Sequence, residues 1–399
     1  MWRVNAPGSL ETLRRRNRGM VLQAVQAGGA TSRVDIVRST GLSRTTVSSL
    51  VNQLIAEGLL AEGTERGGPS GAHQTGRPPT RLTLEPSGGA VLGIHLRHDG
   101  IRLALADLAG SVLAEVLVDL DVDHRADAAL AFVEDATSDL LAEAGIARDR
   151  LLGAGVAVSS PVPTRSNHGP ALLTTWHDID VADVLGRRLG VPVQVGNDAN
   201  LGATAERVFG AARSARSLVY VMLAEGVGAG LFLDGRTYVG ANGVAGEFGH
   251  VVVAPGGQVC RCGNRGCLET VAGAGALVAA LPPRAGDGAR DLDDVLAACR
   301  DGDPGASRIV ADAGRAVGTA LAGVCTMLDP DLVVVGGRTA AAGAPLLDGI
   351  VETLQRGVPP TEESPVRVVV GELGARAEVL GAVALAIAAA PLALLHDGS

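Results

Sequence analysis

The sequence predicts a chain of the α/β class, with a helix-turn-helix head at its N-terminus and a larger body of two lobes. The length of 399 residues is too great for one hydrophobic core and fits two or three domains. Up to residue 85 the apolar residues follow a helical period, and beyond it short Val/Leu/Ile runs alternate with helical stretches. Strands that alternate with helices over about 300 residues form layered sheets in two lobes.

Charge is distributed unevenly along the chain. Lys and Arg number 34 and Asp and Glu number 43, which gives a net charge of −9. Residues 1–85 nevertheless hold eleven Arg and six acidic residues, so this segment is basic and the rest is acidic. A basic head on an acidic body predicts that nucleic acid is bound only at the N-terminus. Aromatic residues make up 2%, which argues against a module that stacks single-stranded bases on rings.

Neither a secretory signal nor a membrane span is predicted. The first twenty residues interleave Arg with polar groups and lack an apolar segment. The long uncharged stretch from Val379 to Leu395 is mostly Ala and contains Pro391, so it predicts a buried helix and not a spanning one. We therefore expect a cytoplasmic protein with no membrane partner.

Three short helices are predicted in the head. The first begins at Asn17 and ends at Gly28-Gly29, and the second begins with a capping box formed by Ser32 and Asp35. Ser43 is the N-cap of the third helix, which follows a tight turn at Gly41, as in a helix-turn-helix. The apolar faces of the second and third helices are assigned to Val34, Ile36 and Val37, and to Val47, Leu50, Val51, Leu54 and Ile55.

The third helix presents a polar face opposite its apolar stripe. This face consists of Arg44, Thr45, Ser48, Ser49 and Asn52. In a major groove, Arg can bind guanine and Asn can bind adenine through two hydrogen bonds each. An ordinary solvated helix face is the alternative. We favour DNA, because a basic cluster at residues 14–16 and a wing belong to the same short module.

A wing and a linker follow the three helices. Residues 65–79 are rich in Gly and Pro, and residues 80–84 alternate as a strand does. Arg77 lies in the sequence Gly-Arg-Pro-Pro, whose prolines hold the backbone extended, as an arm in a minor groove requires. A plain linker is the alternative for Arg77. We assign residues 10–85 to a winged helix-turn-helix that binds double-stranded operator DNA.

Three of the five cysteines lie within eight residues of one another. Cys260, Cys262 and Cys267 are separated by glycines that let the chain wrap, and His250 is upstream as a fourth ligand. Three thiolates and one imidazole form a closed tetrahedral zinc site, which has no open position for catalysis. We expect one structural Zn²⁺ here.

Carboxylates and amides occur near this loop and after a predicted strand. Asn197 and Asp198 follow the strand at residues 191–195, at the edge where ligands of α/β sheets bind. Glu247 and Glu269 lie on either side of the cysteine loop. Each is a weak indication alone, because carboxylates near loops are usually solvated. Together in one cleft they would suit a ligand with many hydroxyl groups.

These motifs, taken in order, resemble the ROK family of repressors and sugar kinases over essentially the whole chain. The most specific part is Glu-Phe-Gly-His at residues 247–250 followed by Cys-Arg-Cys-Gly-Asn-Arg-Gly-Cys-Leu-Glu at residues 260–269. The resemblance implies an actin-like, two-lobed body of the sugar-kinase type, whose cleft binds a hexose or an N-acetylhexosamine. It also implies that zinc holds the His250 loop, and that the sugar hydroxyls contact Asn197, Asp198, Glu247, His250 and Glu269.

We divide the body into two lobes on this basis. The first lobe comprises residues 86–198 together with a C-terminal helix at residues 376–395. The second lobe comprises residues 199–375 and contains the zinc loop.

The chain departs from the kinases of the family at both ATP loops. Where they have Asp-x-Gly-Gly-Thr, residues 95–99 are His-Leu-Arg-His-Asp, so the glycines that allow close phosphate approach are absent. Where they have Gly-Thr-Gly, this chain has Ala224-Glu225-Gly226, which sets a carboxylate against a polyphosphate. ATP binding should therefore be lost, and Asp198, which resembles the kinase base, would have no phosphoryl group to serve. Leu172 replaces an Asn that contacts the sugar in the kinases.

We therefore expect a DNA-binding transcriptional regulator, a repressor and not an enzyme, whose body senses a sugar or sugar derivative. Ligand binding between the lobes would favour one hinge state, and a homodimer or homotetramer would transmit that state to the spacing of two recognition helices. Two alternatives stay open. One is an ATP-dependent sugar kinase with an appended DNA-binding module, and the other is a ligand-independent regulator with a vestigial cleft.

Overall fold

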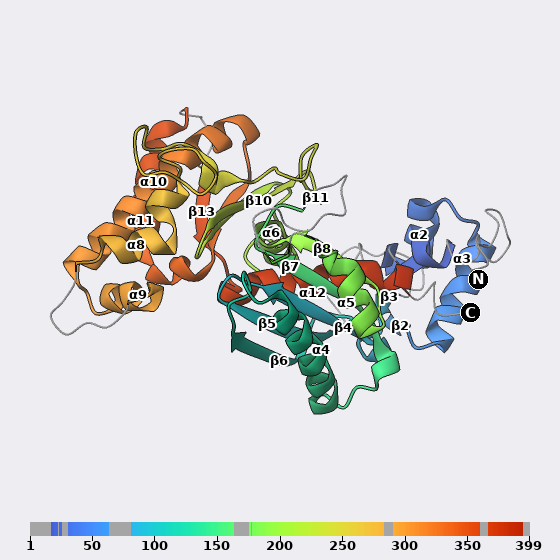
Figure 1. Ribbon diagram of the computed structural model, residues 1–399. Helices are drawn as coiled ribbons and strands as arrows, with labels where there is room; N and C mark the ends of the chain where they lie inside the picture. Colours follow the sequence, from blue (N-terminus) through green and yellow to red (C-terminus); the bar gives the residue numbers. More distant parts are fainter. Residues whose placement is uncertain are drawn as a thin grey trace.

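A computed structural model describes residues 17–22, 24–25, 31–63, 81–162, 175–176, 178–282, 290–359 and 366–393. The described chain forms a small head and a body of two lobes, each lobe built on a five-stranded sheet. Figure 1 shows the head next to the first lobe, with the second lobe on the opposite side of the molecule. Leu172, Arg77 and residues 14–16 lie outside the described residues.

The second and third helices of the head begin where their capping residues predict, and the predicted end of the first at Gly28-Gly29 lies outside the described residues. Residues 17–22 and 24–25 are helical, and α2 (Arg33–Thr40) and α3 (Arg44–Ala56) follow. The capping box of Ser32 and Asp35 is present, and Gly41 ends α2 with a left-handed φ of 69°. The Ser43 side chain accepts a hydrogen bond from the Thr46 amide and so caps α3. The predicted helix-turn-helix is therefore confirmed.

The apolar face of α2 was predicted wrongly at one position. Val34 is 57% exposed, whereas Ile36 is fully buried. Residues two positions apart in an α-helix are separated by about 200° around its axis, so Val34 and Ile36 cannot lie on one face. The stripe of α3 is confirmed, since it is buried at Val47, Leu50, Val51 and Leu54 and partly buried at Ile55.

Three short strands form the sheet of the head. β2 (Leu60–Gly63) and β1 (Thr31–Ser32) both pair antiparallel with β3 (Arg81–Leu84), which confirms the strand predicted at residues 80–84. Leu84 packs against the core of the head and against the core between the first sheet and α12. The short η1 (Pro86–Gly88) then leads into the body, and the amide of Glu85 donates to the carbonyl of Leu59 at 3.0 Å. The head is thus packed directly on the first lobe.

The sheet of the first lobe has the order β6-β5-β4-β7-β8. Its strands are β4 (Ala90–Leu96), β5 (Gly100–Asp107), β6 (Val112–Asp119), β7 (Leu151–Val158) and β8 (Val193–Asn197). β4, β7 and β8 are parallel, whereas β5 and β6 are antiparallel to their neighbours. One face is covered by α4 (Ala126–Glu143) and α5 (Val181–Leu189), and the other by α12 (Ala377–Ala393). β6 was not predicted, although six of its eight residues are apolar; at the sheet edge only Ala114 of these is buried.

The sheet of the second lobe has the order β11-β10-β9-β12-β13. Its strands are β9 (Leu218–Leu223), β10 (Val227–Leu233), β11 (Arg236–Thr237), β12 (Leu332–Gly336) and β13 (Arg367–Val370). α6 (Asp198–Val208) packs on one face, and a core on the other face includes α9 (Leu292–Arg300), α10 (Pro304–Leu328) and α11 (Ala344–Gly357). Among the described helices, α10 alone is long and apolar enough to cross a membrane. Val310, Val317 and Leu321 are fully buried in this core, which fits a core helix.

The helix predicted at the C-terminus is confirmed as the buried α12. It packs against β4, β7 and α6, and Figure 1 shows it running from between the lobes toward the head. Glycine permits this close contact, because a Cβ atom on Gly155 of β7 would lie 2.0 Å from the carbonyl oxygen of Ala382.

Substituting Gly155 tests how much the fold depends on this contact. Gly155→Ala should lower the free energy of unfolding by about 1–3 kcal/mol, because the added methyl group meets helix backbone that cannot rotate away. Gly323→Ala is the matched control, since an added methyl group at Gly323 of α10 would meet no neighbouring atom within 4 Å, and it should stabilise by up to about 1 kcal/mol. Urea unfolding measures both, and equal midpoints for the two variants would contradict the expectation.

Candidate ligand cleft, metal loop and DNA-binding surface

A cleft lies between the two lobes and contains about 860 Å³ of space that is continuous with solvent. Residues of β4, β8 and α12 and the segment after β7 line it from the first lobe. The turns after β9 and β12 and parts of the segment 246–269 line it from the second. The structure brings all five residues of the predicted sugar site to this cleft. They are Asn197, Asp198, Glu247, His250 and Glu269.

Asn197 and Asp198 are held at the start of α6, where β8 ends. The side-chain oxygen of Asn197 accepts from the amide of Asn200 and caps the helix, while its Nδ2 donates to Asp198 Oδ1 at 3.1 Å. Asp198 is only 3% exposed, and its Oδ2 has no hydrogen-bond partner among the described residues. Burial raises the pKa of Asp198 to about 6. An unpartnered buried carboxylate oxygen at a cleft is suited to accept from a ligand hydroxyl.

Two further buried ionisable groups line the cleft. Glu378, at the start of α12, accepts a hydrogen bond from Tyr220 Oη at 2.9 Å, and burial raises the pKa of Glu378 to about 7. His95, on β4, is 6% exposed, and neither ring nitrogen has a partner among the residues that are described. Burial, with Arg97 nearby, lowers the pKa of His95 to about 3, so its imidazole is neutral.

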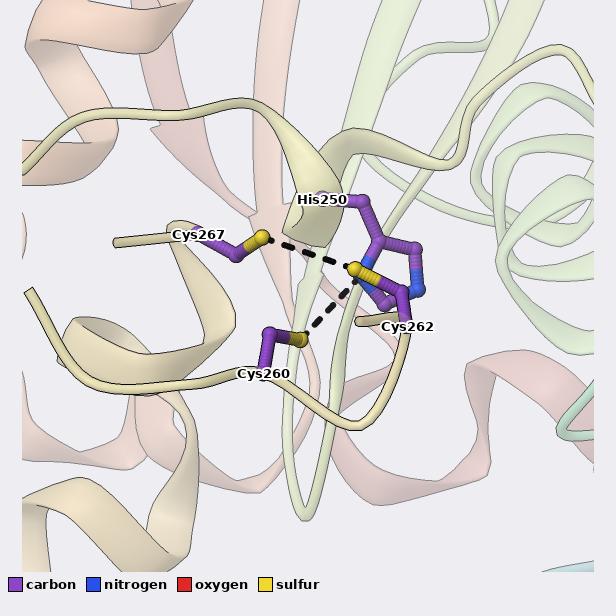
Figure 2. Close-up of side chains that lie close together, drawn as sticks. All are labelled: His250, Cys260, Cys262 and Cys267. Atoms are coloured by element: carbon purple, nitrogen blue, oxygen red, sulfur yellow. Dashed lines mark hydrogen bonds between the residues drawn. The ribbon is translucent and has the colours of Figure 1, made fainter. Parts of the chain in front are cut away.

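The predicted metal ligands converge in the second lobe. His250 ends the short η3 (Phe248–His250), and the cysteines lie on the loop that follows. Figure 2 shows the four side chains pointing toward one another. Cys260 Sγ lies 3.6 Å from His250 Nδ1, Cys262 Sγ lies 3.6 Å from Cys267 Sγ, and all four donor atoms lie within 4.8 Å of one another.

These distances fit a tetrahedral metal ion. Zinc–sulfur bonds of about 2.3 Å place two ligands of a tetrahedron about 3.8 Å apart, close to the separations observed here. The loop can close this tightly because Gly266 has a φ of 69°, and a Cβ atom there would meet the carbonyl oxygen of Ala254. The group His250, Cys260, Cys262 and Cys267 can therefore hold a metal ion.

Ion pairs occupy the two loops where the kinases of the family bind ATP phosphates. The Arg97 guanidinium makes a fork with the Asp99 carboxylate in the β4–β5 turn, with contacts of 2.7–3.0 Å. Arg338, at the start of η4 (Arg338–Ala342), donates to Glu225 Oε1 at 2.6 Å and pairs with Asp293 at 3.0 Å. Arg338 also lies 3.4 Å from Asp99 Oδ2. These pairs link the phosphate-loop positions of both lobes.

The polar face of α3 faces solvent as predicted. Arg44, Thr45, Ser49 and Asn52 are exposed, and Ser48 is half-buried. Arg33 of α2 donates to the side-chain oxygen of Asn52 at 2.9 Å and to Glu62 of β2 at 2.6 Å. Arg33 thus fixes the C-terminal half of this face against the wing sheet.

The fold and the cleft define a class of protein, a sugar-kinase-like body joined to a winged helix-turn-helix. Residues 91–389 match the ROK family, and residues 14–61 match a winged helix-turn-helix DNA-binding domain. The chain belongs to the ROK family and carries a DNA-binding head, which confirms the resemblance drawn from its motifs.

Curated relatives and solved structures support this assignment. A xylose repressor of Caldicellulosiruptor bescii is 27% identical over 95% of this chain and 97% of its own. The DNA-binding transcriptional dual regulator NagC of Escherichia coli is 29% identical, over 86% of this chain and 85% of its own.

Two solved structures resemble this chain over different shares of its length. A ROK family transcriptional regulator, a homologue of the E. coli MLC protein, superimposes with a TM-score of 0.74 at 26% identity, over 96% of this chain and 98% of its own. A ROK family glucokinase from Streptomyces griseus, in complex with glucose and AMPPNP, superimposes with a TM-score of 0.65 at 28% identity, over 75% of this chain and 99% of its own. The regulator is matched over both head and body, and the glucokinase over three quarters of this chain.

Several cleft residues were not predicted from the sequence. Arg261 lies inside the cysteine motif, and its position between two metal ligands was a signal for it. Arg338 follows a Gly-Gly pair at the end of β12, a pattern typical of ligand-binding turns in α/β sheets. Glu378 is the only charged residue of α12, and a buried ionisable group with a shifted pKa at a cleft is a candidate for function.

The raised pKa of Asp198 predicts a pH-dependent effect on stability. Its folded pKa of about 6 lies above its ordinary value of 3.8, so its contribution to stability is complete below about pH 4 and is lost as the pH rises through about 6. Asp198→Asn should therefore stabilise the protein above about pH 6, by about 2–3 kcal/mol, with a much smaller gain near pH 4. Denaturant unfolding at both pH values measures this difference.

Asp331→Asn is a control for which we expect the opposite change in stability. Hydrogen bonds from the amides of Ser217 and Arg216 lower the pKa of Asp331, so this carboxylate stabilises the fold at neutral pH. Its replacement should destabilise the protein at neutral pH and lose that effect in acid.

For Asp198→Asn, the expected gain in the free energy of unfolding depends on pH. A gain that is independent of pH would show that the pKa of Asp198 is not raised.

The metal site predicts stoichiometric binding. The purified protein should contain about one metal ion per chain, and Cys262→Ser should lower that content because it removes one of four ligands. Cys299→Ser is the control, since Cys299 lies on α9 and not in the loop. Elemental analysis of dialysed protein gives the stoichiometry. Equal metal content in Cys262→Ser and the parent would contradict the assignment.

Proposed function

We propose that this protein is a sugar-responsive transcriptional repressor. One observation carries the proposal: five polar residues from separate parts of the chain line one cleft, in a chain that also carries a DNA-binding head. The relatives named as xylose and N-acetylglucosamine repressors support a sugar or sugar derivative as the effector. The head would bind double-stranded operator DNA through Arg44, Thr45, Ser48, Ser49 and Asn52, with Arg77 in the minor groove.

The cleft residues would divide the recognition of a sugar among them. Asp198, Glu247 and Glu269 would accept hydrogen bonds from hydroxyl groups, and Asn197 would offer an amide. Zn²⁺ is the ion we propose for the loop, held by His250 and the three cysteines. When bound, it would fix the His250 imidazole and the adjoining loop at the wall of the cleft and would take no part in a reaction.

We further propose that the protein transfers no phosphoryl group. A nucleotide needs backbone amides and cations free to meet its phosphates. Here Arg97 is paired with Asp99, and Arg338 is paired with Glu225 and Asp293. The carboxylate of Glu225 also lines the cleft and would repel a phosphate. A sugar kinase is the second candidate, because Asp198 is retained where the kinase base would lie and the body resembles a glucokinase.

The effector would act by changing how the two lobes are arranged relative to one another. A sugar held by Asp198 of the first lobe and Glu247 of the second would favour one lobe arrangement, and the head is packed on the first lobe through Leu84. A homodimer or homotetramer in the cytoplasm would convert that arrangement into a spacing of two α3 helices.

Operator titration with and without sugar tests the proposed function. Addition of the effector should change operator affinity by roughly 5- to 150-fold. Glu247→Ala should abolish the response and leave ligand-free DNA binding intact, because Glu247 lies in the cleft and not in the head. Glu143→Ala, an exposed acidic position on α4, is the control and should respond as the parent does. A sugar that binds in the cleft without changing operator affinity would refute the sensor.

A kinase assay separates the two candidates. With D-glucose, D-xylose or N-acetyl-D-glucosamine and Mg-ATP, ADP release should stay at the background rate, because the phosphate positions are filled by ion pairs. Mg-ATP alone should also leave the melting temperature unchanged. Sugar-dependent turnover that Asp198→Ala abolishes would establish the kinase instead.

A further inference from the structure

Arg261 occupies an unusual place, because it lies between two metal-binding residues and also lines the cleft. Its neighbours in sequence are Cys260 and Cys262, and its guanidinium makes a fork with the carboxylate of Glu269. Nε lies 2.9 Å from Glu269 Oε1, and Nη2 donates to Glu269 Oε2 at 3.0 Å. The amide of Val227 donates to the same Oε2 at 3.3 Å. Glu269 is therefore held from two sides.

The turn between β9 and β10 closes over this ion pair. A Cβ atom on Gly226 would lie 2.9 Å from Glu269 Oε2 and 3.2 Å from Arg261 Nη2. The turn thus comes so close to the fork that any side chain at this position would press on it. The pair is a packed part of the cleft wall, although the Arg261 side chain keeps 46% of its surface exposed.

We propose that Arg261 is a positioning and specificity residue of the sugar site. It orients the carboxylate of Glu269, and its remaining donor group is free to bind a ligand oxygen. The contacts described for Arg261 use Nε and Nη2, which leaves the N–H groups of Nη1 for the ligand. The inference rests on the sugar site proposed above.

The chemistry of a sugar hydroxyl matches such a pair. A hydroxyl group donates one hydrogen bond and accepts another, while an ionised carboxylate only accepts and a guanidinium only donates. Glu269 and Arg261 side by side can satisfy both needs of one hydroxyl, or of two adjacent ones. A charge-assisted bond of this kind is also stronger than one between neutral groups.

The metal would reach the ligand through this residue. Because Arg261 has a ligand cysteine on each side, a bound ion would fix its backbone and hence the direction of its guanidinium. Arg261 would then connect the metal loop to the sugar site in addition to His250, which belongs to both. Unlike His250, Arg261 does not hold the metal, so substituting it should weaken sugar binding while the metal stays bound.

The test compares three variants with the parent. Isothermal titration with D-xylose, D-glucose and N-acetyl-D-glucosamine gives the affinities, and elemental analysis gives the metal content of every sample. Arg261→Ala should weaken the sugar that the parent binds best by roughly 10- to 100-fold and narrow the difference among the three sugars. Arg261→Lys should recover part of the loss, because a lysine keeps the charge but cannot form the fork. All should retain the parent's metal content.

Arg265→Ala is the matched control. Arg265 is exposed on the same loop, and its removal changes the net charge equally, so affinity should stay within about twofold of the parent.

The outcomes distinguish a failure of the role inferred for Arg261 from a failure of the proposed sugar site. If Arg261→Ala binds sugar as the parent does, the inference is wrong and the sugar site stands. If the parent binds none of the three sugars, the sugar site and the inference both fail. If Arg261→Ala loses its metal, the test rests on Arg261→Lys. Sugar affinity equal to that of the parent in an Arg261→Lys variant that keeps its metal would refute the role of the fork.

Discussion

The close packing of α12 on β4 and β7 is the contact on which the rest of the arrangement depends. Gly93 and Gly155 lack side chains where the helix backbone approaches, so the helix and the first sheet form one rigid layer. The same helix contributes Glu378 to the cleft, where Tyr220 of the second lobe donates to it. Its middle and far end share a core with Leu84 of the head. One element thus contacts both lobes and the strand that enters the head.

The polar groups of the cleft fit the proposal that the cleft binds a sugar and no nucleotide. A kinase cleft must keep cations free for a nucleotide, whereas here the arginines of both phosphate loops are neutralised within the chain. Among the residues that line the cleft, His95 and Asp198 have buried side-chain atoms without a hydrogen-bond partner in the described part of the chain. Buried polar atoms without partners are costly, so a ligand with hydroxyl groups gains from satisfying them. This arrangement supports the proposed sugar site.

Features formed by neighbours in sequence could be predicted from their spacing. The meeting of the five cleft residues was expected through the family resemblance, and the ion pairs and hydrogen bonds across the fold could not be predicted. The capping box at Ser32 and the cysteine loop involve residues within about ten positions of each other, so their spacing alone fixes the contact. Arg338 and Glu225 are separated by 113 residues, and Tyr220 and Glu378 by 158. Nothing local shows which carboxylate such a residue will meet. The error at Val34 has a related cause, because a helix of eight residues is too short for its apolar pattern to fix which side faces the core.

The ion pair between Arg338 and Asp99 links the two lobes only weakly, as the proposed sensor would require. Arg338 reaches across to Asp99 at 3.4 Å, and Asp99 is 43% exposed, so solvent screens the pair. Such a pair contributes about 0–1 kcal/mol. A ligand can shift a hinge only by the difference in its affinity for the two states, and a few well-made hydrogen bonds, at about 1 kcal/mol each, exceed that barrier. For the sensor proposed above, this weak pairing would leave the balance between lobe arrangements within reach of one small ligand.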